Sequence, residues 1–222
     1  MRDSFSILKN AVFILLVFFS ATALAEKHKI GILVFDDVLT SDVTAPLEVF
    51  GIASKKSWFT DYDVITINVG NEPAITTEEG LKLVVDDHIS NQPQVDVLLV
   101  PSSYDMTSLL KNAALIKYLQ TTAEQADWMA SNCSGAFLLA EAGLLDGVKA
   151  TTWSGGEGKL AKAYPNVDVQ VDQNVVVDKN VITSNGSLVS YQAAFTLLAQ
   201  LTSQKNVDEV KDTLQLERFL KL

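Results

Sequence analysis

Cysteine and histidine are scarce in this chain of 222 residues, which has one cysteine, Cys133, and two histidines, His28 and His88. A single cysteine excludes a disulfide within the chain. The two histidines do not belong to a cluster with the spacing of metal ligands. We therefore predict a protein that has no metal site and no other cofactor.

Basic residues are also too few for a nucleic-acid-binding surface. The chain has 17 lysines and arginines against 27 aspartates and glutamates, which gives a formal net charge of −10 at pH 7. Such a surface repels nucleic acid backbones, and the sequence has no basic tail or stripe that would contact them. We therefore expect no nucleic acid partner.

Long apolar runs are limited to nine residues, at 11–19. This run is much shorter than the roughly 20 residues of a membrane-spanning helix. Arg2 and Lys9 precede the run, and a small-x-small sequence follows it at residues 23–25, which is the pattern of an export signal. The N-terminal segment is therefore expected to serve targeting and to lie outside the fold.

We expect residues 1–25 to be a signal peptide that is cleaved after Ala25, so that the mature protein is periplasmic or secreted. Residues 26–222 have the length of a single domain with one sizeable core. A retained membrane anchor is the alternative to cleavage. We expect no lipid anchor, because the only cysteine, Cys133, is far from the signal. No stable membrane anchor is expected after cleavage.

Strand-like and helix-like segments alternate along the mature chain. The nearly unbroken apolar run at 29–35 is typical of a strand that is buried on both faces of a sheet. Strands that alternate with helices of 10 to 15 residues favour a mostly parallel sheet with helices on both faces. The sequence therefore predicts an α/β sandwich. We expect strands at 29–35, 62–69, 81–85, 95–100, 127–132, 148–152, 167–171, 175–178 and 181–184, and helices at 44–55, 113–126, 134–142, 158–164, 188–201 and 207–220.

Cys133 lies at the turn between an expected strand and an expected helix. A thiol at a helix N-terminus meets free backbone N–H groups and the positive end of the helix dipole, which favour the thiolate. Ser134 places a hydroxyl and an amide beside the sulfur, and Gly135 permits a tight turn. This pattern predicts a nucleophile beside an oxyanion donor. The alternative is a small buried apolar residue, which is what most free cysteines are.

Polar segments follow three of the expected strands, at 36–44, 101–104 and 132–135. Ligands of open α/β sheets bind outside the carboxyl ends of the strands, so we expect these segments to form one site. In the first segment Thr44 is the predicted N-cap of a helix that has Pro46 in its first turn.

The segments 35–51, 95–101, 133–147, 150–152 and 182–186 together resemble the DJ-1/PfpI family. The similarity is greatest to the branch that holds isonitrile hydratases and the N-terminal domains of some AraC-type regulators. It implies a flavodoxin-like three-layer sandwich, related to class I glutamine amidotransferases, that commonly forms homodimers.

The resemblance also implies the roles of several residues. Cys133 corresponds to the family's nucleophile, and Asp42 and Ser134 correspond to the aspartate and the hydroxyl residue that accompany it in isonitrile hydratases. A carboxyl group beside a thiolate has a raised pKa and can act as a general acid near neutral pH. These residues imply a cysteine-dependent hydratase or hydrolase that acts on a small electrophile such as an isonitrile. An ordinary turn or cap residue is the alternative for Asp42.

The chain departs from the family pattern at four positions, one of which is Asn132, where an apolar residue is usual before the cysteine. Trp153 stands where relatives often have a histidine, so a papain-like protease or a glutaminase would lack its base. Ser102 and Ser103 stand in place of a glycine pair that forms an oxyanion turn, and serine disfavours the backbone angles that glycine permits. The predicted residues for substrate and oxyanion binding are Ser102, Ser103, Gly135, Thr44 and Trp153.

Two functions other than catalysis are compatible with the same residues. A reactive and unpaired Cys133 could be oxidised reversibly, as in a redox-sensing or stress-protective protein. The domain could also bind a small molecule without chemistry, as in the ligand-sensing halves of AraC-type regulators.

Overall fold

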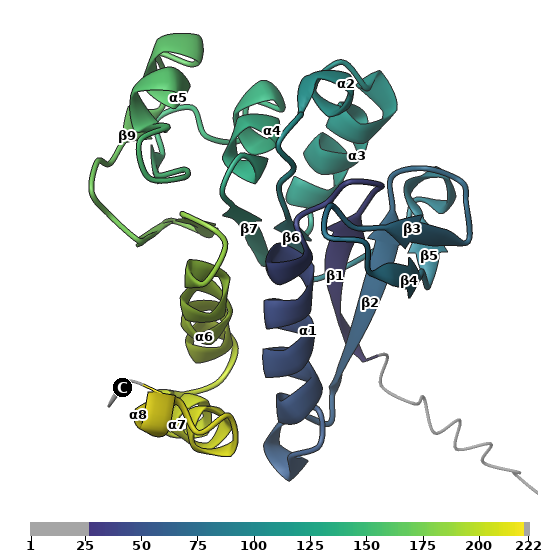
Figure 1. Cartoon of the computed structure of the whole chain (residues 1–222), viewed down its shortest axis with the longest axis vertical. Coiled ribbons are helices and arrows are strands. Elements are labelled where there is room, and N and C mark those ends of the chain that lie inside the picture. The colour runs from purple at the N-terminus through teal and green to yellow at the C-terminus, as the bar shows by residue number, and fades with distance from the viewer. Residues whose placement is uncertain (1–26, 220–222) are drawn as a thin grey trace, which may run out of the picture.

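The structure is a computed structural model that describes residues 27–219. The predicted signal peptide and its cleavage site after Ala25 lie outside the described residues. A seven-stranded sheet, in the order β10-β11-β7-β6-β1-β2-β5, forms the centre of the molecule, with helices on both faces (Figure 1). All neighbouring strands are parallel except β10, which is antiparallel to β11. The predicted α/β sandwich with a mostly parallel sheet is confirmed.

The strands of this sheet are β1 (His28–Val34), β2 (Tyr62–Asn68), β5 (Asp87–His88), β6 (Val97–Val100), β7 (Trp128–Asn132), β10 (Val175–Asp178) and β11 (Val181–Ser184). Two small sheets lie beside it: the antiparallel pair β3 (Ala74–Thr76) and β4 (Lys82–Val84), and the parallel pair β8 (Lys149–Ala150) and β9 (Asp168–Val169). The strand predicted at 81–85 therefore belongs to a hairpin and not to the main sheet.

The helices are α1 (Thr40–Ala53), α2 (Thr107–Leu110), α3 (Ala113–Ala123), α4 (Gly135–Glu141), α5 (Glu157–Ala163), α6 (Val189–Leu201), α7 (Gln204–Thr213) and α8 (Leu216–Phe219), with short 3₁₀ turns at Ser57–Phe59 and Ile89–Asn91. The single helix predicted at 207–220 is divided at Gln215, whose φ of 56° lies in the left-handed region. No helix of the described part of the chain is long and apolar enough to cross a membrane.

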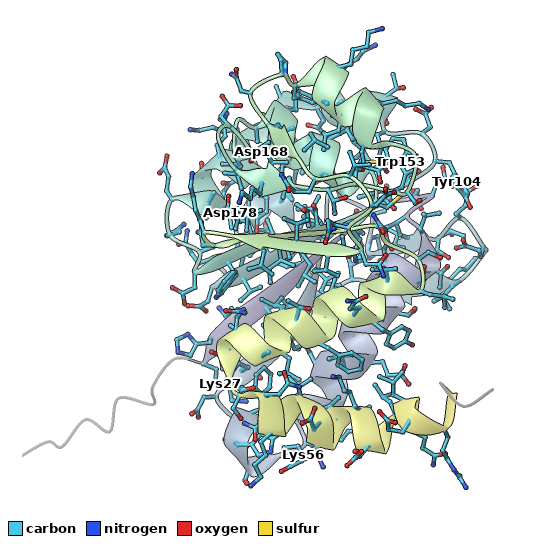
Figure 2. The ribbon with its side chains drawn as sticks, turned by 90° about the vertical axis from the view of Figure 1, so that its left-hand side faces the viewer. Lys27, Lys56, Tyr104, Trp153, Asp168 and Asp178 are labelled. Atoms are coloured by element: carbon cyan, nitrogen blue, oxygen red, sulfur yellow. The ribbon has the colours of Figure 1, made fainter. Side chains whose placement is uncertain are left out.

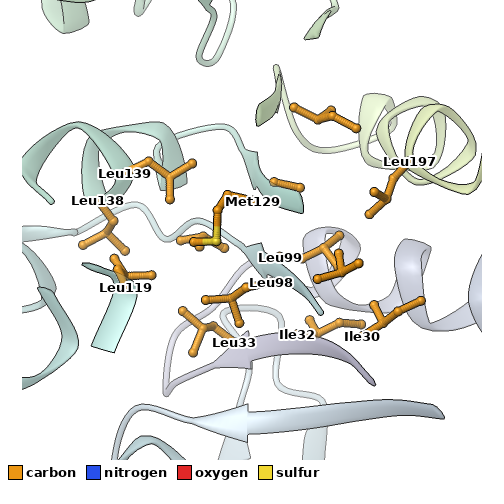
Figure 3. Packing of buried hydrophobic residues seen from close by; sticks show 14 of the residues in the cluster. Ile30, Ile32, Leu33, Leu98, Leu99, Leu119, Met129, Leu138, Leu139 and Leu197 are labelled. Carbon is orange, nitrogen blue, oxygen red and sulfur yellow. The ribbon is translucent and has the colours of Figure 1, made fainter. Parts of the chain in front are cut away.

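The core has two layers because successive side chains of a strand point to opposite faces of the sheet. On β1, Leu33 packs on the side of α3 and α4, whereas Ile30 and Ile32 face α1 and α6 (Figure 3). On β6, Leu98 and Leu99 divide in the same way. Burial on both faces explains why these strands read as continuous apolar runs.

Helix α1 begins at Thr40 with Leu39 at the N-cap, so the prediction that Thr44 is the N-cap is wrong. Thr44 lies within the helix, where its Oγ1 donates a hydrogen bond to the Thr40 carbonyl at 2.9 Å. The free amide at the start of the helix, on Thr40, donates instead to the Glu79 carboxylate at 2.9 Å. Because Glu79 belongs to the turn between β3 and β4, the local sequence does not show this cap.

Pro46 therefore lies inside α1 and not in its first turn. Proline has no amide hydrogen, so the carbonyl of Asp42, four residues earlier, cannot receive the usual helix hydrogen bond. The side chain of Asn132, at the end of β7, lies 3.4 Å from this carbonyl and donates to it. This contact joins the first turn of α1 to the strand that leads to Cys133.

Candidate functional site

A cavity of about 470 Å³ lies at the carboxyl ends of the parallel strands and is lined by Cys133. The predicted residues Ser103, Ser134 and Trp153 also line it. Figure 2 shows Trp153 and Tyr104 on the right-hand side of the view, opposite Lys27, which directly precedes β1. The further residues of the wall are Leu39, Ser41, Glu79, Tyr104, Asn185 and Ser187.

Cys133 occupies the elbow between β7 and α4 in a strained backbone conformation. Its φ is 49°, a value in the left-handed region that few residues other than glycine adopt. The surrounding backbone fixes it, because its N–H donates to the Ser184 carbonyl at 2.8 Å and its carbonyl accepts from the Thr152 hydroxyl at 2.7 Å. The side chain is half-buried in the wall of the cavity. Strain of this kind is characteristic of functional sites.

Two glycines let other segments approach the elbow. A Cβ on Gly135 would lie 2.3 Å from the Val100 carbonyl oxygen, so α4 can begin close to the end of β6 only with glycine there. A Cβ on Gly186 would lie 2.5 Å from the Cβ of Cys133 and 3.1 Å from Oδ1 of Asp42. Gly135 therefore allows α4 to pack close to the end of β6, while the left-handed backbone conformation of the turn is adopted by Cys133 itself.

Asp42 is buried beside the elbow, with 1% of its surface exposed. Its Oδ2 accepts hydrogen bonds from the Ser102 hydroxyl at 2.5 Å and the Ser102 amide at 3.2 Å. Its Oδ1 accepts from the Ser190 hydroxyl at 2.7 Å and the Ser187 amide at 3.0 Å. Burial raises the pKa of Asp42 and outweighs these four hydrogen bonds, which act to lower it. The carboxyl group is therefore suited to hold a proton at higher pH than a surface aspartate.

The thiol of Cys133 also has a raised pKa. Burial is the main cause, and the negative charge of Asp42 adds to it. Hydrogen bonds from the Ser102 side chain and from Ser134 lower the pKa but do not compensate. The expectation that the position at a helix N-terminus favours the thiolate is therefore wrong, because burial and a neighbouring carboxylate raise the pKa of the thiol.

The Pro-Ser-Ser turn does not provide the oxyanion donors that the sequence suggested. Ser102 is completely buried, and both its hydroxyl and its amide donate to Asp42. The amide of Ser103 points to the sulfur of Met106 at 3.3 Å, and its carbonyl accepts from the Ser134 hydroxyl at 2.9 Å. The Ser134 amide is the backbone donor that reaches the thiol.

No imidazole lines the cavity. Trp153 stacks on Phe137 with ring centroids 5.3 Å apart, and Lys159 holds its ammonium group 5.6 Å from the Trp153 ring centroid. His28 pairs with Asp96 at 3.1 Å, and His88 contacts the Gly70 carbonyl at 3.0 Å. Trp153 therefore lies in the wall of the cavity and offers no base.

Four predicted site residues, Thr44, Asp42, Ser102 and Gly135, do not line this cavity. Asp42, Ser102 and Gly135 are packed around the elbow behind the wall, whereas Thr44 is half-buried within α1. Sequence reasoning also missed several contributors. Ser187 and Ser190 hold Asp42, and Asn185 donates from Nδ2 to the Thr152 carbonyl at 2.5 Å. The Ser-Asn-Gly segment after β11 was visible in the sequence, but its contacts depend on how α6 packs beside α1. Within residues 27–219, no group of three or more His, Cys, Asp and Glu side chains could hold a metal ion.

The fold and the cavity define a class of α/β proteins in which a cysteine occupies a strand–helix elbow at the carboxyl edge of a mostly parallel sheet. The model of the DJ-1/PfpI family matches residues 28–200, and the chain belongs to this family. The predicted resemblance is confirmed.

Individual relatives agree with this assignment. The chain is 30% identical over 191 residues to an isonitrile hydratase of Pseudomonas putida, covering 85% of this chain and 78% of that enzyme. It is 25% identical over 159 residues to the HTH-type transcriptional regulator GbdR of Pseudomonas aeruginosa, covering 72% of this chain and 42% of the regulator. The crystal structure of a ThiJ/PfpI family protein from Pseudomonas syringae has a TM-score of 0.75 at 22% identity, covering 85% of this chain and 75% of that one. This last likeness shows the fold.

Proposed function

We propose that this protein is a cysteine-dependent hydratase that acts on a small electrophile of the isonitrile type, with Cys133 as nucleophile and Asp42 as general acid. The observation that carries the proposal is the buried Asp42 carboxyl, whose raised pKa suits it to hold a proton, beside a cysteine that faces a cavity. The similarity to an isonitrile hydratase supports the choice of substrate class.

The proposed reaction balances with these two residues and one water. The thiol proton of Cys133 first passes to the Asp42 carboxylate. The sulfur then forms a bond to the terminal carbon of the isonitrile, and Asp42 donates this proton to the same carbon, which gives a thioimidate and leaves Asp42 as a carboxylate. Water then adds to the same carbon, nitrogen takes a proton, and the carbon–sulfur bond breaks to release an N-substituted formamide. The second proton of the water goes to the sulfur, so Cys133 is again a thiol and Asp42 a carboxylate.

The departures from a hydrolase favour this chemistry over amide hydrolysis. Amide hydrolysis needs a base for the leaving amine and usually two donors for the oxyanion. Trp153 offers no base, and the Ser103 amide is directed at Met106. Addition to an isonitrile needs a proton donor and no leaving amine, and Asp42 meets this need.

The test uses purified protein spanning residues 26–222 and a panel of alkyl and aryl isonitriles, with formamide measured by NMR or chromatography. We expect turnover by the wild type and a loss of at least about 10²-fold for Cys133→Ala and Asp42→Asn. Circular dichroism and melting temperature confirm that each variant is folded. Equal turnover by the wild type and Cys133→Ala would refute the nucleophilic role.

A redox-sensing role receives less support because the pKa of Cys133 is raised, which lowers the fraction of reactive thiolate. A small-molecule-binding role is the outcome if isonitriles raise the melting temperature of the protein without being converted. Mass spectrometry after mild peroxide treatment separates the redox role from both.

The location and assembly of the protein are part of the same proposal. The apolar run at 11–19 supports export, and membership of the DJ-1/PfpI family supports a homodimer. Cell fractionation and light scattering after size-exclusion chromatography test these two points. The acidic composition supports a protein that does not bind DNA, although part of the chain is similar to part of a regulator.

A further inference from the structure

We propose that the hydroxyl of Ser102 relays a proton between the thiol of Cys133 and the carboxyl group of Asp42. The inference rests on the proposed function of these two residues. It assigns to Ser102 a role in the reaction in place of the oxyanion role that the sequence suggested.

The position of Ser102 is the basis of this proposal. Its hydroxyl lies 2.5 Å from Oδ2 of Asp42, and its amide holds the same oxygen at 3.2 Å. Hydrogen bonding from the Ser102 side chain also acts on the Cys133 thiol, where it lowers the pKa. Because Ser102 is completely buried, no water competes for these contacts.

Asp42 and Cys133 have no direct hydrogen bond in the described part of the chain, although they lie close together. Oδ1 of Asp42 and the Cβ of Cys133 are both within 3.1 Å of the place that a Cβ on Gly186 would take. The carboxyl oxygens accept hydrogen bonds from serine hydroxyls and amides, and of these serines only Ser102 also acts on the pKa of the thiol. A proton that passes between the two groups without water therefore has a path through Ser102.

The proton transfer is balanced without any further reagent. In the forward step the S–H of Cys133 gives its proton to Oγ of Ser102 while the O–H of Ser102 gives its proton to Oδ2 of Asp42. The products are a thiolate, an intact serine hydroxyl and a neutral carboxyl group. The reverse movement restores the thiol, so the pair holds one shared proton and titrates as a coupled unit.

Few other charges face this unit. Glu79 lines the cavity from the turn between β3 and β4, and Lys159 lies beyond the Trp153 ring. Glu157 accepts from the Gly155 amide, and Glu48 on α1 is exposed and bonded to the Tyr191 hydroxyl. None of these four residues is among the causes of the Cys133 pKa shift, which are burial, Ser102, Asp42 and Ser134.

The test measures the rate of Cys133 alkylation by iodoacetamide against pH, by mass spectrometry and without substrate. Ser102→Ala removes a hydrogen bond that stabilises the thiolate, so we expect its midpoint to move to higher pH and its rate near pH 7.5 to fall about three- to tenfold. Ser102→Thr keeps a hydroxyl and should restore most of the rate.

Ser190→Ala is the matched control, because Ser190 holds the other oxygen of Asp42 at 2.7 Å. Its loss raises the pKa of Asp42 and reduces the negative charge beside the thiol, so the alkylation rate should stay the same or rise. A merely structural role of Ser102 predicts the same change for both alanine variants. Equal shifts for the two, or no shift for Ser102→Ala, would overturn the relay.

Isonitrile turnover gives a separate readout. If Ser102→Ala shifts the thiol titration and lowers turnover, the relay and the proposed function both stand. If the titration shifts while the folded wild type converts no isonitrile, the link through Ser102 stands and the hydratase proposal fails. If turnover is normal in Ser102→Ala with an unshifted titration, the relay fails and the hydratase proposal stands.

Discussion

The carboxylate of Glu79 accepts a hydrogen bond from the backbone N–H of Thr40 at 2.9 Å, although 39 positions separate the two residues. Thr40 is the first residue of α1, and Glu79 lies in the wall of the Cys133 cavity. Hydrogen bonds from the Thr40 side chain and amide lower the pKa of Glu79, so it stays ionised. One contact therefore caps the helix that carries Asp42 and fixes a negative charge at the cavity.

The charge of Glu79 should select against anionic reagents and substrates. Replacing it in Glu79→Gln removes the charge and keeps an oxygen that can accept from Thr40. We expect the rate of Cys133 alkylation by iodoacetate, relative to neutral iodoacetamide, to rise about threefold at low ionic strength. Added salt should reduce the difference between the variant and the wild type.

Glu124→Gln serves as the control because it removes the same charge at an exposed residue. Glu124 follows α3 and does not line the cavity. An equal change in both variants would mean that net charge, and not the position of Glu79, sets the preference.

The close contact between Gly186 and Cys133 predicts a strong effect of added bulk. Gly186→Ala places a Cβ 2.5 Å from the Cβ of Cys133, at a φ of 77°. We expect the free energy of unfolding to fall by more than about 2 kcal/mol, since both strain and overpacking contribute. Urea denaturation measures the loss.

Gly51→Ala is the matched control for this prediction. Gly51 lies in α1, and an added Cβ there meets nothing within 4 Å. Alanine favours helix over glycine, so Gly51→Ala should be more stable than the wild type by about 0.5–1 kcal/mol. If Gly186→Ala were as stable as Gly51→Ala, the close packing of Gly186 against the elbow would be wrong.

The sequence predicted the elements that depend on local patterns. The strand β1 could be located from its continuous apolar run, which is the local pattern of burial on both faces. The elbow at Cys133 could be located from the local strand–turn–helix pattern. The start of α1 was not predictable in this way. Its cap is Glu79, and no local pattern relates a residue of a distant hairpin to Thr40.

The sequence indicated the main candidate residues of the site but not the hydrogen bonds between them. Asp42, Cys133 and Ser102 all appeared as candidates, since each follows a strand at the same edge of the sheet. The sequence did not predict the hydrogen-bond partners of Asp42, because they depend on the packing of α6, which brings Ser190 to Asp42. The sign of the Cys133 pKa shift was also missed, since burial is a property of the folded chain.

Asn132 and Pro46 should be energetically coupled through the Asp42 carbonyl. Pro46 leaves this oxygen without its helix donor, and Asn132 donates to it at 3.4 Å. Asn132→Ala should therefore cost about 1–3 kcal/mol in the wild-type background. In a Pro46→Ala background the helix supplies an amide hydrogen, so the same change should cost about 1 kcal/mol less.

A double-mutant cycle measured by chemical denaturation gives this coupling. The hydrogen bond from Ser184 to Asn132, at 2.6 Å, is lost in both backgrounds and cancels. Additive effects of the two substitutions would show that Asn132 does not compensate for the proline.

Asp42→Asn should change thiol reactivity and turnover in opposite directions. The carboxylate raises the pKa of the Cys133 thiol, so its neutral replacement should lower that pKa and speed alkylation near pH 7.5 about two- to fivefold. The same variant has no proton donor, so isonitrile turnover should fall by at least about 10²-fold.

Because burial raises the pKa of Asp42 above its unfolded value, the wild type should also lose stability as pH rises from the unfolded pKa through the folded one. Asp42→Asn should not show this part of the loss. Thiol alkylation, formamide production and denaturation at several pH values test the three effects, and a parallel fall of alkylation and turnover would contradict the assignment of Asp42 as the acid beside the thiol.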